Sequence, residues 1–370
     1  MNVEKMGQVF TPAHIVEDMK SLIKNKGRKL EPSCGDGAFL KHIDIDVSIE
    51  IDKVVGHKNS ILMDFYDYSV SEKFDTIIGN PPYVAYKNID KLTKSKLDES
   101  IFDKRTNLYI HFIYKCFLHL EKNGEIIFIT PREFLKSCSS MKLNNILWNN
   151  GTITDILDFG DNNIFKGYSP NVIIWRYEKD NFKREFLYNG KKKMLSFNKG
   201  QFFFSNEKLV REFSEFFYVK VGGVSGCDKV FSHQSGEIES VYSKTVNDGS
   251  LRNFIYEDRM NTHLIKNRKI LENRYLNGEW YNWIRKFYIS NDERVYVNCK
   301  TRNKEPFFYN KCRYYDGSVL GIFFKKNFNV KEVIQVLNSL NWKDLGFMHD
   351  KRYIFTQRTL ESCLLPDIFK

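Results

Sequence analysis

The residues Asn80, Pro81, Pro82 and Tyr83 follow a short apolar run, and their types suit one particular chemical task. An exocyclic aromatic amine, such as N6 of adenine, is a poor nucleophile because its lone pair is delocalised into the ring. Two carbonyl-type acceptors on its two N–H bonds would draw the nitrogen towards sp3 geometry and aim the lone pair at an electrophile. The Asn80 side chain can supply one acceptor, and the Pro81 carbonyl, held by the fixed φ of two consecutive prolines, can supply the other. With the ring of Tyr83 as a stacking face, the stretch predicts a rigid clamp for a planar amine or amide; a plain Pro-Pro turn is the alternative.

A glycine-containing segment at residues 30–40, LEPSCGDGAFL, is the second candidate element. The pattern predicts a strand that ends near Glu31, a turn at Gly35 and Gly37, and then the start of an apolar helix. Such a turn lets a ligand lie against the backbone at the carboxyl edge of a parallel sheet, although it can also be a tight turn and nothing more. Glu31 disfavours a phosphate ligand at this edge and suits a cation or an ammonium group.

Two further acidic residues end the next expected strands. Glu50, in the stretch SIEIDK, could accept hydrogen bonds from both ribose hydroxyls of a nucleoside-type cofactor. Nearby alternatives for this role are Asp44, Asp46 and Asp52. Asp64, in the stretch LMDFYD, could accept from an adenine amino group while the adenine ring lies against Phe65. Each of these acids could instead be an ordinary solvated loop residue.

These residues need a scaffold that brings several strand ends together. Up to about Tyr177, short β-rich runs alternate with helical stretches at residues 11–25 and 107–123; the runs are KVVGHK, FDTIIGN, GEIIFIT, DILDF and NVIIWRY. This alternation predicts an α/β fold with a doubly wound, mostly parallel sheet covered on both faces. The helix that begins near Asn107 carries a 3.6-period apolar stripe, and the EKNG signal at residues 121–124 is expected to end it.

The length of 370 residues is comfortable for two domains, which we expect at residues 1–195 and 196–370. The polar segment at residues 178–200 is a linker or an edge hairpin in this interpretation, and the part beyond it has the short strands of a mixed α+β domain. No apolar run approaches the ~20 residues of a membrane span. Seven cysteines without metal-binding spacing predict reduced thiols, a cytosolic location and no metal site.

The net charge of +11 makes a polyanion the first partner to consider, with a generic basic surface as the alternative. Residues 1–200 hold 30 Lys and Arg against 26 Asp and Glu (+4), and residues 201–370 hold 27 against 20 (+7). In the second part, basic residues are interleaved with aromatic ones, as on a surface that contacts phosphates and bases. The candidate DNA-binding residues are Arg268, Arg274, Arg285, Lys300, Arg302 and Arg313.

Taken together, these motifs resemble the gamma-class N6-adenine DNA methyltransferases of restriction–modification systems, over about residues 6–177 in unbroken order. GQVFTPAHIVEDM looks like the N-terminal cofactor element of that family, with Thr11 near the methionine end of S-adenosyl-L-methionine. The resemblance implies cofactor contacts at Thr11, Glu31, Ser33, Cys34, Glu50, Asp64, Phe65 and Pro82. It implies catalytic roles for Asn80, Pro81, Pro82 and Tyr83, and for Phe165, which would pack against a flipped adenine. The abbreviated stretch between Gly37 and Glu50 departs from the family pattern and weakens the ribose assignment.

The resemblance further implies a class I, Rossmann-like S-adenosylmethionine-dependent methyltransferase domain followed by a DNA target-recognition domain. The glycine-rich stretch at residues 219–231 would lead into the second domain, where its glycines would let the backbone approach a duplex or only mark a turn. The implied enzyme is a site-specific, adenine-specific DNA methyltransferase, cytoplasmic in a bacterial or viral setting. Its partners would be double-stranded DNA and a cognate restriction endonuclease for the same site, with no membrane and no metal. The alternatives are a methyltransferase acting on RNA or a protein glutamine, and a DNA-binding subunit that performs no chemistry.

Overall fold

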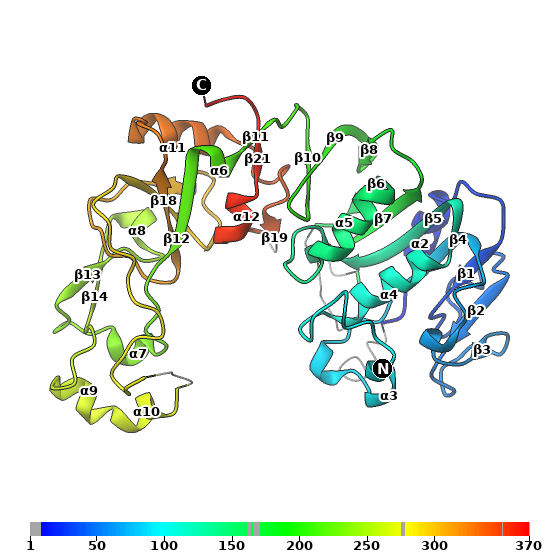
Figure 1. Cartoon of the computed structure of the whole chain (residues 1–370), viewed down its shortest axis with the longest axis horizontal. Coiled ribbons are helices and arrows are strands. Elements are labelled where there is room, and N and C mark those ends of the chain that lie inside the picture. The colour runs from blue at the N-terminus through cyan, green and yellow to red at the C-terminus, as the bar shows by residue number, and fades with distance from the viewer. Residues whose placement is uncertain (1–8, 161–163, 166–170, 275–277, 350, 370) are drawn as a thin grey trace. The chain divides into compact units, whose positions relative to one another are not determined.

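Two compact units make up the chain, and the computed structural model describes residues 9–160, 164–165, 171–274, 278–349 and 351–369. The first unit comprises Met1–Lys208 and the second Leu209–Lys370 (Figure 1). The expected boundary between residues 195 and 196 falls inside strand β9 (Lys191–Asn198) of the first unit. The division follows the last strand of the sheet, β10 (Gln201–Ser205), instead of preceding it.

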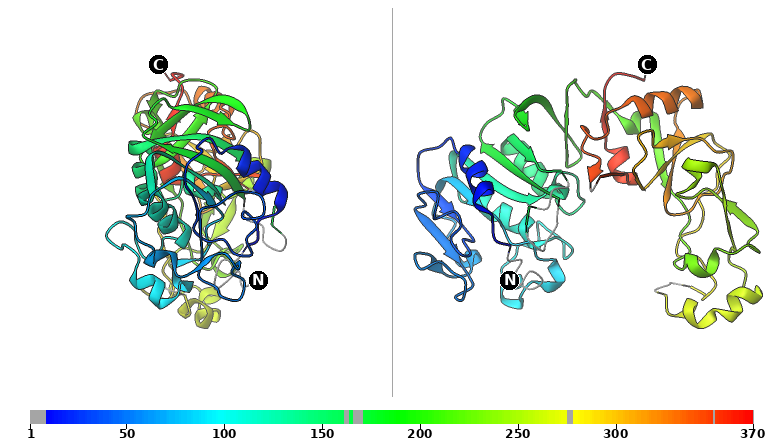
Figure 2. Two further views of the ribbon diagram at one scale, coloured as in Figure 1. Left: turned by 90° about the vertical axis from the view of Figure 1, so that its right-hand side faces the viewer. Right: turned by 180° about the vertical axis from the view of Figure 1, so that it is seen from behind.

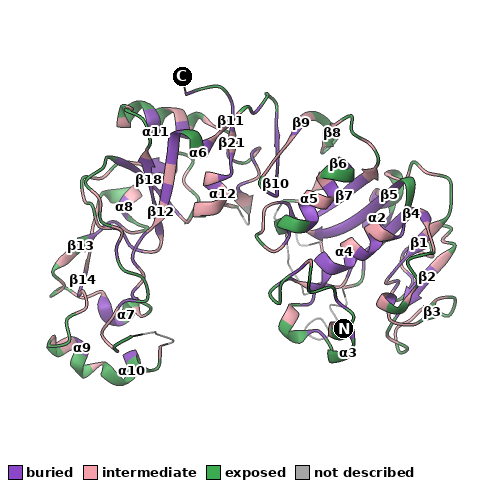
Figure 3. Cartoon of the chain, viewed as in Figure 1, coloured by how far each residue is buried: buried purple, intermediate pink, exposed green. Residues whose placement is uncertain are grey.

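A ten-stranded sheet forms the centre of the first unit, in the order β10-β9-β8-β6-β7-β5-β4-β1-β2-β3. Its other strands are β1 (Lys29–Glu31), β2 (Val47–Glu50), β3 (Ile61–Leu62), β4 (Phe74–Gly79), β5 (Leu120–Pro131), β6 (Gly151–Asp158), β7 (Val172–Lys179) and β8 (Glu185–Tyr188). The central strands are buried on both sides (Figure 3). Their near-continuous apolar sequences, such as EIIFIT in β5, are typical of strands covered on both faces.

The strand order places a topological switch point between β1 and β4. Strand β1 pairs in parallel with β2 on one side and with β4 on the other, and β2 and β4 pair in parallel with β3 and β5. Strand β7 is antiparallel to both β5 and β6, between which it lies. The expected doubly wound α/β fold is confirmed, and its ligand site is expected at the carboxyl ends of β1 and β4.

Helices of the first unit pack against the strands that follow them in the chain. Helix α4 (Leu108–Leu118) contacts β5, and α5 (Met141–Asn150) contacts β6. Asn107 caps α4 by accepting a hydrogen bond from the Tyr109 N–H, and Pro12 precedes α2 (Ala13–Ser21). The shorter helices are α3 (Lys91–Ser95) and the 3-10 turns η1 (Phe65–Asp67), η2 (Tyr86–Asn88) and η3 (Arg132–Leu135).

Three local expectations for this unit are wrong. Residues 53–58, expected as a strand, form a turn and loop after β2. The side chain of Val54 is 83% exposed, so it does not contribute to the core as a strand residue would. The residues after Gly37 form consecutive turns instead of a helix, since the chain must already enter β2 at Val47. Helix α4 ends at Leu118, before the EKNG signal, because Leu120 already pairs with Phe74 of β4.

The polar segment at residues 178–200 extends the sheet. Strands β8 and β9 pair antiparallel, and so do β9 and β10. Of the two alternatives for this segment, the hairpin is confirmed. The aromatic rings of Phe186, Tyr188 and Phe204 pack together on these strands and attach the hairpin to the core.

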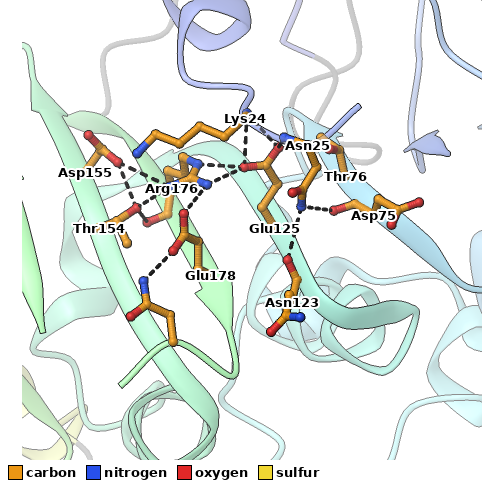
Figure 4. Close-up of polar contacts among 11 residues, drawn as sticks. Lys24, Asn25, Asp75, Thr76, Asn123, Glu125, Thr154, Asp155, Arg176 and Glu178 are labelled. Atoms are coloured by element: carbon orange, nitrogen blue, oxygen red, sulfur yellow. Dashed lines mark hydrogen bonds and ion pairs between the residues drawn. The ribbon is translucent and has the colours of Figure 1, made fainter. Parts of the chain in front are cut away.

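A buried charge network joins β4, β5, β6 and β7 in the first unit (Figure 4). Glu125 is fully buried, and its Oε2 lies 2.6 Å from Nη2 of Arg176. Its Oε1 accepts from the backbone N–H groups of Lys24 and Asn25 and from the Thr76 hydroxyl. These bonds satisfy the buried carboxylate, which would otherwise be costly in the core, and tie the segment after α2 to the sheet.

The second unit is a mixed α+β structure, as expected. Its four-stranded antiparallel sheet has the order β12-β18-β15-β17, and α11 (Val330–Ser339) contacts β15 and β17. Figure 2 shows the unit in two further views, with α11 as an orange helix. The strands of this unit are β11 (Arg211–Glu212), β12 (Phe217–Val221), β13 (Ile238–Ser240), β14 (Arg252–Phe254), β15 (Arg294–Asn298), β16 (Lys300–Thr301), β17 (Phe307–Phe308), β18 (Val319–Phe324), β19 (Met348–His349), β20 (Arg352–Ile354) and β21 (Leu364–Leu365). Its other helices are α6 (Phe213–Phe216), α7 (Asp228–Phe231), α8 (Thr245–Asp248), α9 (Thr262–Lys266), α10 (Arg268–Glu272) and α12 (Gln357–Glu361).

Two glycines after β12 are required by packing within the second unit. A Cβ at Gly222 would lie 2.2 Å from the backbone oxygen of Asp316, and one at Gly223 would lie 2.7 Å from the ring of Phe287. Neither alternative for this glycine-rich stretch, approach to a duplex or a simple turn, accounts for these contacts. The glycines let two segments of the same unit pack closely.

The described part of the chain contains no helix that is both long and apolar enough to cross a lipid bilayer.

Replacing Arg176 by Met should lower the free energy of unfolding by about 3–5 kcal/mol, because Glu125 would stay buried without its cation. Urea denaturation measures the change. The matched control is Arg28→Met, which removes an exposed ion pair with Glu72 and should cost less than about 1 kcal/mol. Equal losses in both variants would show that the buried network contributes no more than a surface pair.

Candidate active site

A cavity opens in the first unit where the strands β1, β2 and β4 end. The predicted residues among its lining are Ser33, Glu50, Asp64, Phe65, Asn80 and Pro82. Val9 and Phe10 from the N-terminal segment and Leu108 and Phe112 from α4 complete parts of the wall. The cavity therefore lies at the switch point of the sheet, where a doubly wound fold places its ligand.

The side-chain amide of Asn80 has a defined orientation in this cavity. Its Nδ2 donates to the Val9 carbonyl at 3.0 Å and to the Thr11 hydroxyl at 3.2 Å. A carbonyl can only accept, so the nitrogen of the amide must face Val9 and the oxygen must face the other way. Asn80 Oδ1 is buried and finds no hydrogen-bond partner among the described residues. One of the two acceptors expected for a clamp is thus present and unsatisfied.

The carbonyl groups of Pro81 and Pro82 differ in their hydrogen bonding. The Pro82 carbonyl accepts from the Val84 N–H at 3.2 Å, whereas no hydrogen bond to the Pro81 carbonyl occurs among the described residues. Tyr83 is 6% exposed and donates its hydroxyl to the Ile129 carbonyl at 2.7 Å. Its ring meets that of Tyr109 edge-on and forms part of the core, so the aromatic position is rigidly held.

Glu31, at the end of β1, is a deeply buried ionisable group near the cavity. It is 1% exposed, and its Oε2 has no hydrogen-bond partner among the described residues. Burial, assisted by the nearby charge of Glu50, raises the pKa of Glu31 well above its ordinary value. A carboxyl group buried without a partner is poised to bind a cation, which would stabilise its ionised form.

Glu50, at the end of β2, shapes the loop after β1. Its Oε2 accepts from the Gly35 N–H at 2.8 Å, and its Oε1 accepts from the N–H groups of Ile51 and Asp52. Gly35 has a φ of 52°, in the left-handed region that favours glycine. The three backbone bonds fix the carboxylate at the cavity wall, where it retains acceptor capacity for one more donor.

Asp64 and Phe65 form another wall, supported by two residues that the sequence interpretation missed. Asp64 Oδ2 accepts from the Thr93 hydroxyl at 3.1 Å and pairs with Lys96 Nζ at 2.9 Å. Hydrogen bonds to Asp67 and Asp64 raise the pKa of Lys96. Thr93 lies in α3 and Lys96 caps its C-terminal end. The sequence interpretation missed both residues because the only local signal in this region is Asp90, the N-cap of α3.

Of the other predicted residues, Cys34 and Phe165 do not line the cavity, whereas Ser33 does. Burial raises the pKa of the Cys34 thiol to about 11, so this cysteine is inert as a nucleophile at neutral pH. The Ser33 hydroxyl donates to the backbone carbonyl of Asn80 at 3.3 Å, which links the β1 and β4 loops. Phe165 is 2% exposed and belongs to the core cluster of the first unit.

The residues of this site fit S-adenosyl-L-methionine. The unpartnered Glu31 carboxyl suits an ammonium group, and Glu50 retains an acceptor position for a ribose hydroxyl. Asp64 has the aromatic ring of Phe65 next to it in the wall, as an adenine ring with its amino group requires. No cluster of three or more His, Cys, Asp or Glu side chains suited to a metal ion occurs in the described residues.

The six basic candidates of the second unit differ in their surroundings. The guanidinium of Arg274 is half-buried, lies over the ring of Phe231, and donates to backbone carbonyls that include those of Leu271 and Asn282. Burial lowers its pKa, and we assign it a structural role. Arg268 pairs with Glu272, and Arg313 bonds to Asn291. Arg285, Lys300 and Arg302 are exposed.

Replacing Glu31 by Gln should change how stability depends on pH. Between the ordinary pKa of a carboxyl group and the raised pKa of Glu31, the folded parent holds a proton that the unfolded chain has released. The parent should therefore lose stability relative to the variant as pH rises from 5 to 8, by at most about 1.4 kcal/mol per pH unit. Urea denaturation of the cofactor-free proteins across this range measures the difference, and parallel pH profiles would contradict the raised pKa.

Comparison with known sequences finds relatives of part of this chain. Residues 15–165 match the model of the Eco57I restriction-modification methylase family. Type II methyltransferase M.HincII from Haemophilus influenzae is 40% identical over 189 residues, which cover 47% of this chain and 37% of that protein. Type II methyltransferase M.TthHB8I from Thermus thermophilus is 29% identical over 196 residues, covering 47% and 45%. The chain thus spans less than half the length of these relatives.

Structural comparison reaches further along the chain. The type IIL restriction-modification enzyme MmeI, solved in complex with DNA, superimposes with a TM-score of 0.59 over 95% of this chain and 63% of its own. The sequence identity is 11%, so this likeness concerns the fold. The first unit has a doubly wound α/β fold, the resemblance of its motifs to restriction–modification methyltransferases is confirmed, and S-adenosyl-L-methionine is the cofactor that the residues of its site fit.

Proposed function

We propose that this chain is a site-specific DNA methyltransferase that transfers a methyl group from S-adenosyl-L-methionine to N6 of an adenine. The observation that carries the proposal is the buried, unpartnered Oδ1 of Asn80. An oxygen in this state can accept a hydrogen bond from an N–H group of a ligand, which would remove the cost of leaving it unsatisfied. The carbonyl of Pro81, next in the chain and without a hydrogen bond among the described residues, supplies a second acceptor, and two acceptors at one nitrogen select an NH2 group.

The residues of the chain contribute positioning and electrostatics to this reaction. S-adenosyl-L-methionine supplies the electrophilic methyl group. Asn80 Oδ1 and the Pro81 carbonyl hold the amino group and hinder delocalisation of its lone pair, and the buried surroundings strengthen both contacts. The methylated nitrogen is acidic enough to release its proton to water, so no general base is needed. The buried Cys34 has no covalent role.

The substrate base must leave the duplex to reach this cavity, since in the base pair one N6 hydrogen is already bonded to the opposite thymine and the clamp needs both hydrogens. Tyr83 and Phe165 are the aromatic side chains that we assign to contact the flipped adenine. Both are buried in the core cluster, so their positions are fixed by packing. Neither ring is part of the cavity lining, and each would supply an aromatic face for stacking with a planar base that enters beyond the lining.

The second unit is proposed as the target-recognition domain. Residues 201–370 carry a charge of +7, and exposed Arg285, Lys300 and Arg302 offer phosphate contacts. An RNA amine or a protein glutamine would present the same NH2 geometry to the clamp. DNA is favoured because the relatives are named Type II methyltransferases and because a DNA-bound enzyme shares the fold over both units. A role in a restriction–modification system, with a cognate endonuclease, is part of the same proposal.

Replacing Asn80 by Ala should abolish methyl transfer to adenine, because one acceptor of the clamp is lost. The affinity for S-adenosyl-L-methionine should change by no more than a few-fold, since the cofactor residues remain. Transfer of labelled methyl to duplex DNA and calorimetric titration of the cofactor measure the two effects. Transfer at nearly the parent rate would eliminate the proposed role of Asn80.

Replacing Arg285, Lys300 and Arg302 by Ala should weaken duplex binding and flatten its salt dependence by about 0.9 in the logarithmic slope for each lost phosphate contact. The control is Lys331→Ala, an exposed lysine on α11, which should leave the slope unchanged. Binding measured between 50 and 200 mM salt tests this, and an unaltered slope in the triple variant would remove these residues from the DNA surface.

A further inference from the structure

The N-terminal segment determines which atom of the Asn80 amide faces the cavity. Both hydrogens of Asn80 Nδ2 are directed to this segment, one to the Val9 carbonyl at 3.0 Å and one to the Thr11 hydroxyl at 3.2 Å. Asn80 and its two partners come from different parts of the sequence, 71 and 69 residues apart. The Thr11 side chain is 8% exposed, so water cannot readily replace its hydroxyl.

The opposite orientation of the amide would reverse the chemistry of the cavity. Rotation by half a turn would place Oδ1 against the Val9 carbonyl, where two acceptors repel, and would turn Nδ2 towards the ligand. A site with N–H groups would prefer a carbonyl oxygen, such as O6 of hypoxanthine, over an amino group. The contact to the Val9 carbonyl therefore decides which atom of the amide faces the ligand, and the Thr11 hydroxyl holds the amide in that orientation by accepting from Nδ2.

We propose that Thr11, together with the Val9 carbonyl, is a positioning residue that locks the Asn80 amide with its oxygen towards the target amine. The inference rests on the proposed function and adds a residue that acts through Asn80 without touching the reacting atoms. Its effect falls on the turnover step, because the lock orients an acceptor for the amine. A role of Thr11 confined to cofactor contact would instead appear in the KM for S-adenosyl-L-methionine.

The decisive variant is Thr11→Val, which removes the hydroxyl and keeps the volume and branching of the side chain. We expect kcat for adenine methylation to fall about three- to tenfold, the usual effect of one hydrogen bond, with KM for S-adenosyl-L-methionine within twofold. Thr11→Ser restores the hydroxyl and should restore kcat. A fall confined to KM, or an unchanged kcat, would overturn the proposal.

A matched control separates the lock from general loss of a buried hydroxyl. Thr130 is also buried and accepts a hydrogen bond from a side-chain N–H, that of Trp175, at 2.9 Å. Thr130→Val should leave kcat within twofold of the parent, and Thr11→Ala serves as a second variant should the Val side chain disturb folding. An equal fall of kcat in Thr130→Val would attribute the effect of Thr11 to general loss of packing and would overturn the lock.

A second readout needs no catalytic activity. In protein labelled with 15N-asparagine, the side-chain amide signal of Asn80 is identified by its absence from the Asn80→Ala spectrum. Its protons should exchange slowly with water in the parent and at least threefold faster in Thr11→Val, but not in Thr11→Ser. An unchanged exchange rate in Thr11→Val would refute the lock, whether or not the parent methylates adenine. A parent that methylates no adenine would refute only the proposed function.

Discussion

The parallel pairing of β1 with β4 is the constraint on which the site depends. Lys29 pairs with Thr76 and Leu30 with Ile77, so the chain leaves both strands at the same edge of the sheet. Glu31 follows Leu30 directly, Asn80 stands three residues after Ile77, and the two are brought to the same edge although they lie far apart in sequence. The hydrogen bond from Ser33 to the Asn80 carbonyl continues this connection beyond the strands. A buried carboxyl group and a buried amide oxygen, neither with a hydrogen-bond partner among the described residues, are thereby placed in one cavity wall or directly behind it.

Much of this arrangement could be predicted from the sequence because its signals are local. The apolar run before Asn80, the acidic residues at successive strand ends and the helix cap at Asn107 each depend on a few neighbouring residues. Their combination predicted the doubly wound sheet and six residues of the cavity lining. The expectation of a carboxyl group at Glu31 that suits a cation agrees with its lack of a partner among the described residues.

Other features could not be predicted because tertiary contacts decide them. The stretch at residues 53–58 has β propensity, but the strand that pairs with β1 is β2, so these residues have no strand position next to β1. Lys96 and Thr93 reach Asp64 only through the fold of the α3 region. The sequence suggested that Gly222 and Gly223 let the backbone approach a duplex or mark a turn, whereas their lack of a Cβ allows close packing on Asp316 and Phe287. Arg274 has a residue type suited to DNA but is held by carbonyls of its own unit.

The protonation of Glu31 has a consequence for calorimetry. A carboxyl group whose pKa is raised by burial holds a proton in the cofactor-free protein over a wider pH range than usual. An arriving ammonium group favours the ionised form, so loading of the site expels this proton into the medium. The heat observed on titration then contains the ionisation enthalpy of the buffer, and it differs between phosphate and Tris at the same pH. The number of protons exchanged, read from that difference, reports directly on a single buried carboxyl group.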